Sequence, residues 1–263
     1  VGYNLAGASY DNKSFSVSSQ DANPNDIAFK TDGTKMYIVG QGNDVIYQYS
    51  LGTSWDVSTA TYDSVSFSVT AQETTPSGLF ISPDGTKMYV TGLIGRDVNE
   101  YTLSTAWDVS TASFIQNFST VSQDTGPEGI SFKSDGTVMY VAGNTNNSIF
   151  QYTLSTAWDL STASYSSKSL NVNSQETAPL GITFKPDGTY LYVFGSGSGE
   201  INSYALSTAW DISTGTFSEV VDLSPQETAV AGGEFTSDGT KLYIVGYATD
   251  TVYQYSTALT TNT

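Results

Sequence analysis

Short runs of aliphatic, β-branched and aromatic residues recur along the whole chain, and clusters of Gly, Pro, Asn, Asp and Ser separate them. The first runs cover residues 27–30, 35–40, 45–51 and 61–69. Runs of this length between turn-forming residues are typical of β-strands. In the second run, from Met36 to Val39, apolar residues occupy both faces. The pattern predicts small sheets packed on both sides, and helical periodicity is missing from the sequence.

The four runs belong to a repeat of about 52 residues. An Asp-Gly pair recurs with steps of 52, 51, 52 and 51 residues, at Asp32, Asp84, Asp135, Asp187 and Asp238. A Gln followed by an acidic residue recurs with the same steps, and Trp and Tyr form two further series in phase. Because several independent markers agree, the chain contains five copies of one structural unit.

Each copy predicts one blade of a β-propeller. Asp32-Gly33 lies between the first two runs, and an Asp-Gly pair between apolar runs is a strong hairpin signal. The chain begins just before an outermost strand and ends just after a third strand, so we expect residues 8–17 to pair near Tyr253–Tyr255. The prediction is an all-β, closed five-bladed β-propeller with four antiparallel strands per blade, whose last blade is completed by the N-terminal strand.

The repeat also predicts the domain organisation. Residues 1–263 are expected to form a single propeller. Its blades are expected at about residues 24–70, 76–121, 127–173, 179–224, and 230–258 together with 5–18.

One segment of each copy resembles the YVTN-type repeat of lactonase-like β-propellers. The resemblance is clearest from Ser82 to Gly92 and from Lys185 to Val193, and it covers about 20 residues in all five copies. The motif is a hairpin with two strands and contains no chemistry, so the resemblance implies a fold and carries over no catalytic residue. The Asn that closes the family motif is glycine here, at Gly40, Gly92, Gly143, Gly195 and Gly246.

The composition excludes several functions. The chain has 26 Asp and Glu against 9 Lys and Arg, a net charge of −17, so we expect no nucleic-acid partner, and the short apolar runs predict no membrane insertion. It has neither Cys nor His. Disulfides, thiolate or imidazole metal sites, Cys nucleophiles and His-based triads are therefore ruled out. No cofactor is predicted, although Ca²⁺ bound by oxygen ligands is compatible with the acidic loops.

In an ordinary propeller, the loops that cross between blades share one face, here called the top face, with the loops between second and third strands. The repeated polar residues of these loops are the candidate ligand-binding residues. They suit sugar hydroxyls, Ca²⁺ or a basic partner. The alternative is that each Gln and acid ties its crossing loop to the neighbouring blade by backbone hydrogen bonds. The candidates are Gln20, Asp21, Gln72, Glu73, Gln123, Asp124, Gln175, Glu176, Gln226 and Glu227, with Asp44, Asp97, Asn147, Glu200 and Asp250.

The opposite face carries the Asp-Gly hairpins and a second candidate set. An aromatic residue recurs in the turn before each outer strand, at Trp55, Trp107, Trp158 and Trp210, with Tyr3 in the closing blade. These rings either stack on a sugar or cap the hydrophobic interior of each blade. Two residues break the symmetry: Glu234, at the start of an inner strand, and Arg96, in a top-face loop. Together they could polarise a ligand, but an acid and one cation give no complete acid–base pair, so we interpret both as drift in a solvated channel.

The repeated layout favours a non-catalytic binding module that presents several similar sites to a glycan or protein ligand, because weak repeated sites gain by avidity. We expect no enzymatic activity and no catalytic residue, since five equivalent acids supply no differentiated acid and base. The alternatives are a structural or protein-docking scaffold, and a lactonase-like or glycoside-cleaving hydrolase. The low Lys and Arg content and strong acidity suit an extracellular or surface-displayed protein.

Overall fold

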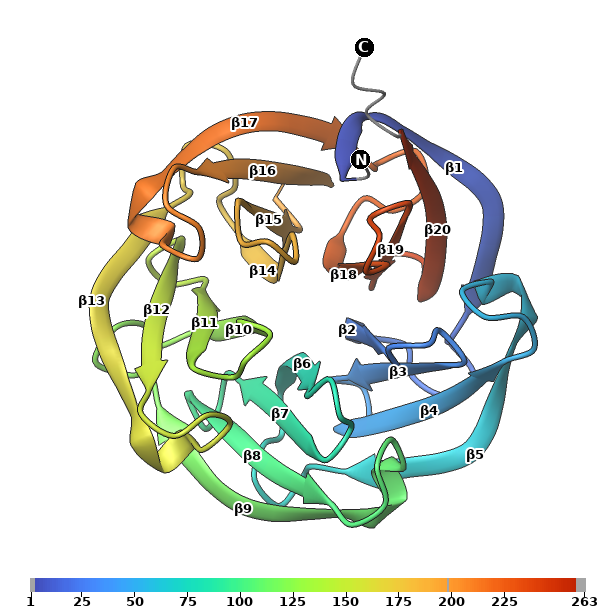
Figure 1. The fold of residues 1–263 in the computed structure, drawn as a ribbon. Coiled ribbons are helices and arrows are strands. Elements are labelled where there is room, and N and C mark those ends of the chain that lie inside the picture. The colour runs from blue at the N-terminus through green and yellow to red at the C-terminus, as the bar shows by residue number, and fades with distance from the viewer. Residues whose placement is uncertain (1–2, 198, 259–263) are drawn as a thin grey trace.

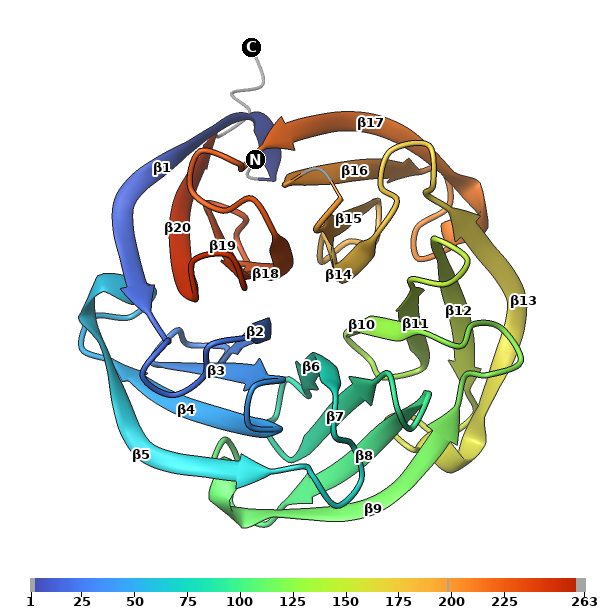
Figure 2. The same cartoon turned by 180° about the vertical axis from the view of Figure 1, so that it is seen from behind.

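The computed structural model describes residues 3–197 and 199–258. Residues 1–2, 198 and 259–263 of the predicted domain lie outside the described residues. Five four-stranded antiparallel sheets surround a common axis, as two opposite views show (Figures 1 and 2). The prediction of an all-β, five-bladed propeller is confirmed.

The strands of each blade run in order from the axis to the rim (Figure 1). The first blade contains β2 Pro24–Phe29, β3 Lys35–Gly40, β4 Val45–Leu51 and β5 Ala60–Ser68. The second contains β6 Pro76–Ile81, β7 Lys87–Gly92, β8 Asp97–Leu103 and β9 Ala112–Ser119. The third contains β10 Pro127–Phe132, β11 Val138–Gly143, β12 Ser148–Leu154 and β13 Ala163–Asn171. The fourth contains β14 Pro179–Phe184, β15 Tyr190–Gly195, β16 Glu200–Leu206 and β17 Gly215–Asp222.

The fifth blade closes the ring with the two ends of the chain. It contains β18 Val230–Phe235, β19 Lys241–Gly246 and β20 Thr251–Ala258, and its outer strand is β1 Asn4–Ser16. In β1, Tyr10 pairs with Tyr255 and Ser14 pairs with Tyr253, with a bulge between Tyr10 and Lys13. The predicted pairing of residues 8–17 with the third strand is therefore confirmed.

A single turn of 3₁₀ helix precedes each outer strand in the first four blades: η1 Val57–Thr59, η2 Val109–Thr111, η3 Leu160–Thr162 and η4 Ile212–Thr214. The carboxylate of Asp56 accepts a hydrogen bond from the Ser58 amide and caps η1, and the equivalent aspartates cap the other three turns. Within the described residues, no helix combines the length and apolar character needed to cross a membrane.

The inner strands begin earlier than the apolar pattern predicts. The hydrophobic run begins at Ile27, but β2 begins at Pro24, which pairs with Gly40 ahead of a register shift at Asp26. A proline is tolerated as the first residue of a strand because that position needs no ladder N–H. The extra residues lie close to the axis of the ring and carry side chains that matter for the site.

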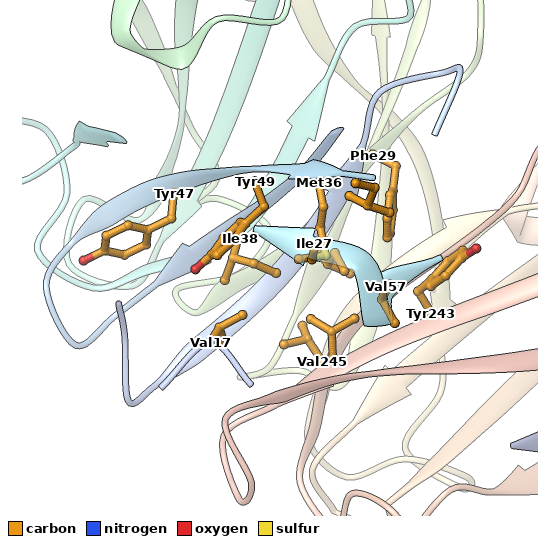
Figure 3. Close-up of a cluster of buried hydrophobic side chains, with 13 residues drawn as sticks. Val17, Ile27, Phe29, Met36, Ile38, Tyr47, Tyr49, Val57, Tyr243 and Val245 are labelled. Atoms are coloured by element: carbon orange, nitrogen blue, oxygen red, sulfur yellow. The ribbon is translucent and has the colours of Figure 1, made fainter. Parts of the chain in front are cut away.

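The hydrophobic core lies between neighbouring blades. Figure 3 shows one cluster, in which Ile27 and Met36 of the first blade pack against Tyr243 and Val245 of the fifth. The second strand of each blade is buried on both faces, as its pattern predicts. Burying one such side chain stabilises a fold by about 1.5–3 kcal/mol, so contacts between blades are the main source of stability.

Candidate functional site

Three cavities follow one another along the axis of the ring. The first, called here the bowl, opens between the hairpins and has a volume of about 230 Å³. The second is a middle cavity of about 50 Å³. The third, called here the vestibule, lies among the top-face loops and has a volume of about 390 Å³. The bowl and the middle cavity share lining residues, among them Phe80 and Glu234, so the two cavities adjoin at these side chains.

Aromatic side chains form the wall of the bowl. Trp55, Trp107 and Trp210 line it together with Tyr3, and phenylalanines at the ends of inner strands lie below them. Each of these four residues has a positive φ of 61–65°. The indole of Trp55 packs so closely on Gly33 that a Cβ on this glycine would lie 2.3 Å from the ring. The Asp-Gly hairpin therefore fixes the aromatic wall as well as the turn.

Hydrogen bonds tie this wall into the core between blades. The hydroxyl of Tyr243 donates to the carbonyl of Trp55 over 2.7 Å, and Tyr37 donates to Trp107 over the same distance. Tyr243 belongs to the fifth blade and Trp55 to the first, so each such bond joins two blades. The rings thus combine a packing role with an exposed edge in the bowl, and a ligand-binding role of the Trp ring stays a prediction.

The floor of the bowl is where the fivefold symmetry fails. One position of the inner strand faces the axis in every blade, and it holds a different residue each time. The five residues are Ala28, Phe80, Ser131, Thr183 and Glu234. The floor thus contains the hydroxyls of Ser131 and Thr183 and the carboxyl group of Glu234, together with apolar side chains of the other two blades. It therefore differs from blade to blade, unlike the loops.

Asp26 joins Glu234 at this floor. Both residues line the middle cavity, Asp26 from β2 and Glu234 from β18 of the adjacent blade. Asp26 accepts hydrogen bonds from the amides of Ile27, at 2.8 Å, and Leu79, at 2.9 Å. Glu234 accepts one from the amide of Phe29 at 2.8 Å. Backbone amides of two blades therefore hold the two carboxyl groups in place.

Both carboxyl groups titrate near neutral pH. Burial raises the pKa of Asp26 to about 7, although its two amide hydrogen bonds act in the opposite direction. Burial raises the pKa of Glu234 to about 8, and the nearby charge of Asp26 adds to this increase. Because like charges in one site disfavour double ionisation, the two groups share about one proton near neutral pH. The floor thus contains a differentiated acid and base.

Asp26 is not among the residues that the sequence predicts for the site, because it lies just before the apolar run that begins at Ile27. The signal was nevertheless present: the other copies have glycine at this position, at Gly78, Gly129, Gly181 and Gly232. A Cβ on Gly232 would lie 2.1 Å from a carboxylate oxygen of Asp26. The glycine of the fifth blade thus leaves the space that the acid of the first blade occupies.

The predicted acidic ring of the top face is buried and turned towards the backbone. Asp21, 1% exposed, accepts amide hydrogen bonds from Asn23, Gly42 and Asn43. A Cβ on Gly40 would lie 2.2 Å from its carboxyl carbon, which explains glycine in place of the family's Asn. The same arrangement recurs with Glu73, Asp124, Glu176 and Glu227. Each acid joins its crossing loop to the loop after the second strand, and ligand binding by this ring stays a prediction.

The glutamines beside these acids contact tyrosines of the third strands. The hydroxyl of Tyr49 lies 3.4 Å from the side-chain oxygen of Gln20, and that of Tyr255 lies 3.0 Å from Gln226. Equivalent contacts join Gln72, Gln123 and Gln175 to Tyr101, Tyr152 and Tyr204.

The predicted set of loop residues Asp44, Asp97, Asn147, Glu200 and Asp250 does not occupy one repeated position. Asp44, Asn147 and Asp250 end their loops with a positive φ of 47–56°. The equivalent positions of the other two blades are Arg96 and Gly199, which also have positive φ. Asp97 and Glu200 are the next residues and begin β8 and β16. Asp97 and Glu200 therefore lie one residue after the position that Asp44, Asn147 and Asp250 occupy in their own blades.

Arg96 and Glu234 do not form a joint site. Arg96 lies in the top-face loop before β8, whereas Glu234 lies in the floor of the bowl, and Arg96 does not line the bowl or the middle cavity. Among the described residues, no group of three acidic side chains is arranged to hold a metal ion. Ca²⁺ binding stays a prediction.

Fold and site together define a β-propeller with a carboxyl pair at the base of an axial aromatic pocket. A family model described as "Lactonase, 7-bladed beta-propeller" matches residues 10–231. The chain therefore belongs to this lactonase family, with five blades where the description gives seven. The resemblance of the YVTN-like repeats is confirmed. A search of the curated proteins finds no match.

Several solved structures share the propeller fold. A proposed 6-phosphogluconolactonase from Bacteroides uniformis is 15% identical, with a TM-score of 0.53 over 90% of this chain and 67% of that protein. Another from Bacteroides fragilis is 17% identical, with a TM-score of 0.51 over 76% and 55%. A protein from Lactobacillus plantarum is 16% identical, with a TM-score of 0.55 over 91% and 69%. The chain spans 55% to 69% of these proteins, and such identities show the fold alone.

The expectation that the chain is not an enzyme is contradicted. Membership in the lactonase family points to a hydrolase. The physical error was to treat the five blades as equivalent, because the loops repeat while the residues around the axis do not. Asp26 and Glu234 both line the middle cavity, so Glu234 has a second carboxyl group beside it that no other blade repeats.

Proposed function

We propose that this chain hydrolyses an uncharged lactone of a sugar acid bound in the bowl. The observation that carries the proposal is the pair of single-copy carboxyl groups, Asp26 and Glu234, beneath an aromatic wall. Aromatic faces suit the C–H face of a sugar ring, and a few polar groups at the base of an apolar pocket are typical of ligand sites. Ser131 and Thr183 add hydroxyls on the same floor.

The two carboxyl groups fit complementary roles. Glu234, with the higher pKa, holds the shared proton and borders the bowl, so it donates this proton to the ring oxygen when the acyl C–O bond breaks. Asp26 lines the middle cavity, which is large enough for a water molecule. It takes a proton from this water as the oxygen attacks the lactone carbonyl carbon. Transfer of that proton from Asp26 to Glu234 restores the pair and leaves one hydroxy acid as product.

The charges around the bowl favour an uncharged substrate over a phosphorylated one. Lys30, Lys133 and Lys185 each lie two residues before the aspartate of a hairpin and pair with it, at 2.8, 2.7 and 2.7 Å. Every lysine of the described chain forms a salt bridge with an Asp or Glu side chain. With a net charge of −17, the protein offers a phosphate group no unpaired lysine.

A glycan remains the proposed source of the ligand, and an extracellular or surface location remains the proposed setting. Support comes from the aromatic wall for the glycan and from the strongly acidic composition for the location. Both are separate from the proposal of lactone hydrolysis.

The test is turnover of glucono-δ-lactone and of its 6-phosphorylated form, followed by proton release and corrected for spontaneous opening. We expect turnover of the uncharged lactone and at least about tenfold lower kcat/KM for the phosphorylated one, because unscreened like charge opposes binding. No turnover of either compound by folded protein would contradict the proposal. Preference for the phosphorylated lactone would contradict its substrate class.

A further inference from the structure

The vestibule is separate from the proposed hydrolytic site. It lies at the opposite end of the axis, among the crossing loops and the loops after the second strands, and none of its lining residues lines the bowl. Its volume of about 390 Å³ exceeds that of the bowl. Each blade contributes equivalent backbone positions to the vestibule. The polarity and charge of the cavity therefore depend on which side chain each blade has at these positions.

A buried carboxylate is the most unusual group in this cavity. Glu128, the second residue of β10, is 7% exposed and lines the vestibule. Its carboxylate oxygen lies 3.4 Å from the side-chain nitrogen of Asn144, a long contact, and no lysine or arginine of the described chain lines the cavity. A buried carboxylate without a cation is costly, and burial raises the pKa of Glu128 to about 7. A positively charged occupant would remove this cost.

Amide groups of the first blade line the same cavity as Glu128. The side-chain nitrogen of Asn25 donates to the carbonyl of Pro76 at 2.9 Å, so its oxygen remains for a ligand. The side-chain nitrogen of Asn23 donates to the side-chain oxygen of Gln41 at 2.9 Å, which leaves the Asn23 oxygen and the Gln41 nitrogen. Acceptors and donors that alternate in this way match hydroxyl groups, which are both.

The fourth and fifth blades contribute apolar side chains to the vestibule, beside the hydroxyl of Ser196. At the position of Glu128, the fourth and fifth blades have Leu180 and Ala231, and at the position of Gln41 the fifth blade has Tyr247. Tyr247 is 38% exposed, so its ring is accessible to an occupant. The cavity therefore combines polar groups with accessible apolar surface, as a sugar ring does with its hydroxyls and its C–H face.

We propose that the vestibule binds a protonated amino sugar, with its ammonium group on Glu128 and its hydroxyls on the amides of the first blade. A hard divalent cation is a poorer match because it takes several carboxylates, and no acidic cluster of that kind exists in the described residues. A neutral sugar satisfies the amides but leaves the carboxylate uncompensated. The charged group and the hydroxyls are both needed to match the cavity.

The experiment compares glucosamine with glucose and N-acetylglucosamine by isothermal titration calorimetry at neutral pH. We expect glucosamine to bind the wild-type protein at least about tenfold more tightly than either uncharged sugar, since a hydrogen bond to a charged group contributes roughly 1.5–3 kcal/mol. Glu128→Gln keeps the size of the side chain and removes its charge. This substitution is expected to abolish the preference.

Glu219→Gln is the matched control, because it removes one acidic charge from the rim strand β17, outside the vestibule. It should keep the preference, whereas Tyr247→Ala should weaken binding of all three sugars alike. Equal affinity for glucosamine and glucose, no binding of glucosamine by folded wild-type protein, or an unchanged preference in Glu128→Gln would each overturn the proposal. The assay measures binding only, so its result is independent of lactone turnover.

Discussion

Replacing Trp107 by alanine tests whether the aromatic wall of the bowl is part of the core. The indole is 9% exposed, lies 6.2 Å from the ring of Tyr37 between ring centres, and packs against Gly85. A buried Trp removes roughly 150–250 Å² from water, worth about 4–6 kcal/mol at about 25 cal/mol per Å². Measured losses for large-to-Ala changes in cores are about 3–5 kcal/mol. We therefore expect a loss of about 4 kcal/mol.

The assay is urea unfolding followed by circular dichroism, with the slope of the transition checked for constancy. The positive φ of 65° at Trp107 is retained by alanine, so backbone strain does not offset the loss. Trp107→Phe is the control, since it keeps an aromatic ring against Gly85 and should lose clearly less. A loss below about 1 kcal/mol for Trp107→Ala would refute the packing role and leave the ring as a ligand surface alone.

Three further changes have defined outcomes. Gly40→Ala places a Cβ 2.2 Å from the carboxyl carbon of Asp21 and should lower the melting temperature, and an unchanged value would contradict the loop-joining role of that acid. Deleting residues 1–18 removes β1, so we expect unfolding or oligomerisation on gel filtration and reject ring closure if a monomer melts unchanged. Because burial raises the pKa values of Asp26 and Glu234 to about 7 and 8, the folded state binds more protons than the unfolded state above pH ~4. The free energy of unfolding should therefore fall from pH 5 to 8 by on the order of 6 kcal/mol. In Glu234→Gln that fall should shrink, and equal pH dependence in both proteins would contradict the raised pKa.

The architecture was predictable because it depends on features that every blade repeats. The Asp-Gly pair marks each hairpin, and the phase of the two chain ends specifies the pairing that β1 and β20 make. These signals are local or periodic, and each has the same structural cause in every copy of the repeat. The repeat places the start of the first blade at about residue 24, but the apolar run marks β2 only from Ile27, because the strand begins with polar residues that carry no apolar pattern.

The candidate site was much less predictable, because it is built from what the blades do not share. Asp26 and Glu234 are 208 positions apart in the sequence, and only the closed ring brings them to one cavity. Glu128 was missed for the same reason: its copies are Asn25, Ser77, Leu180 and Ala231, so no repeated pattern points to it. The residues that repeat in every blade are those that a blade needs to fold. The residues of the candidate sites occur in one blade only, at axial positions where the other blades have different side chains.

The most direct test of the central claim is the effect of Glu234→Gln on turnover of glucono-δ-lactone. Removing a general acid lowers kcat by roughly 10²–10⁴-fold, and we expect a loss in this range while the circular dichroism spectrum is unchanged. Glu219→Gln, an acid of the rim strand β17, is the matched control and should retain wild-type activity. A Glu234→Gln protein that hydrolyses the lactone at the wild-type rate would contradict the assignment of the active site to the floor of the bowl.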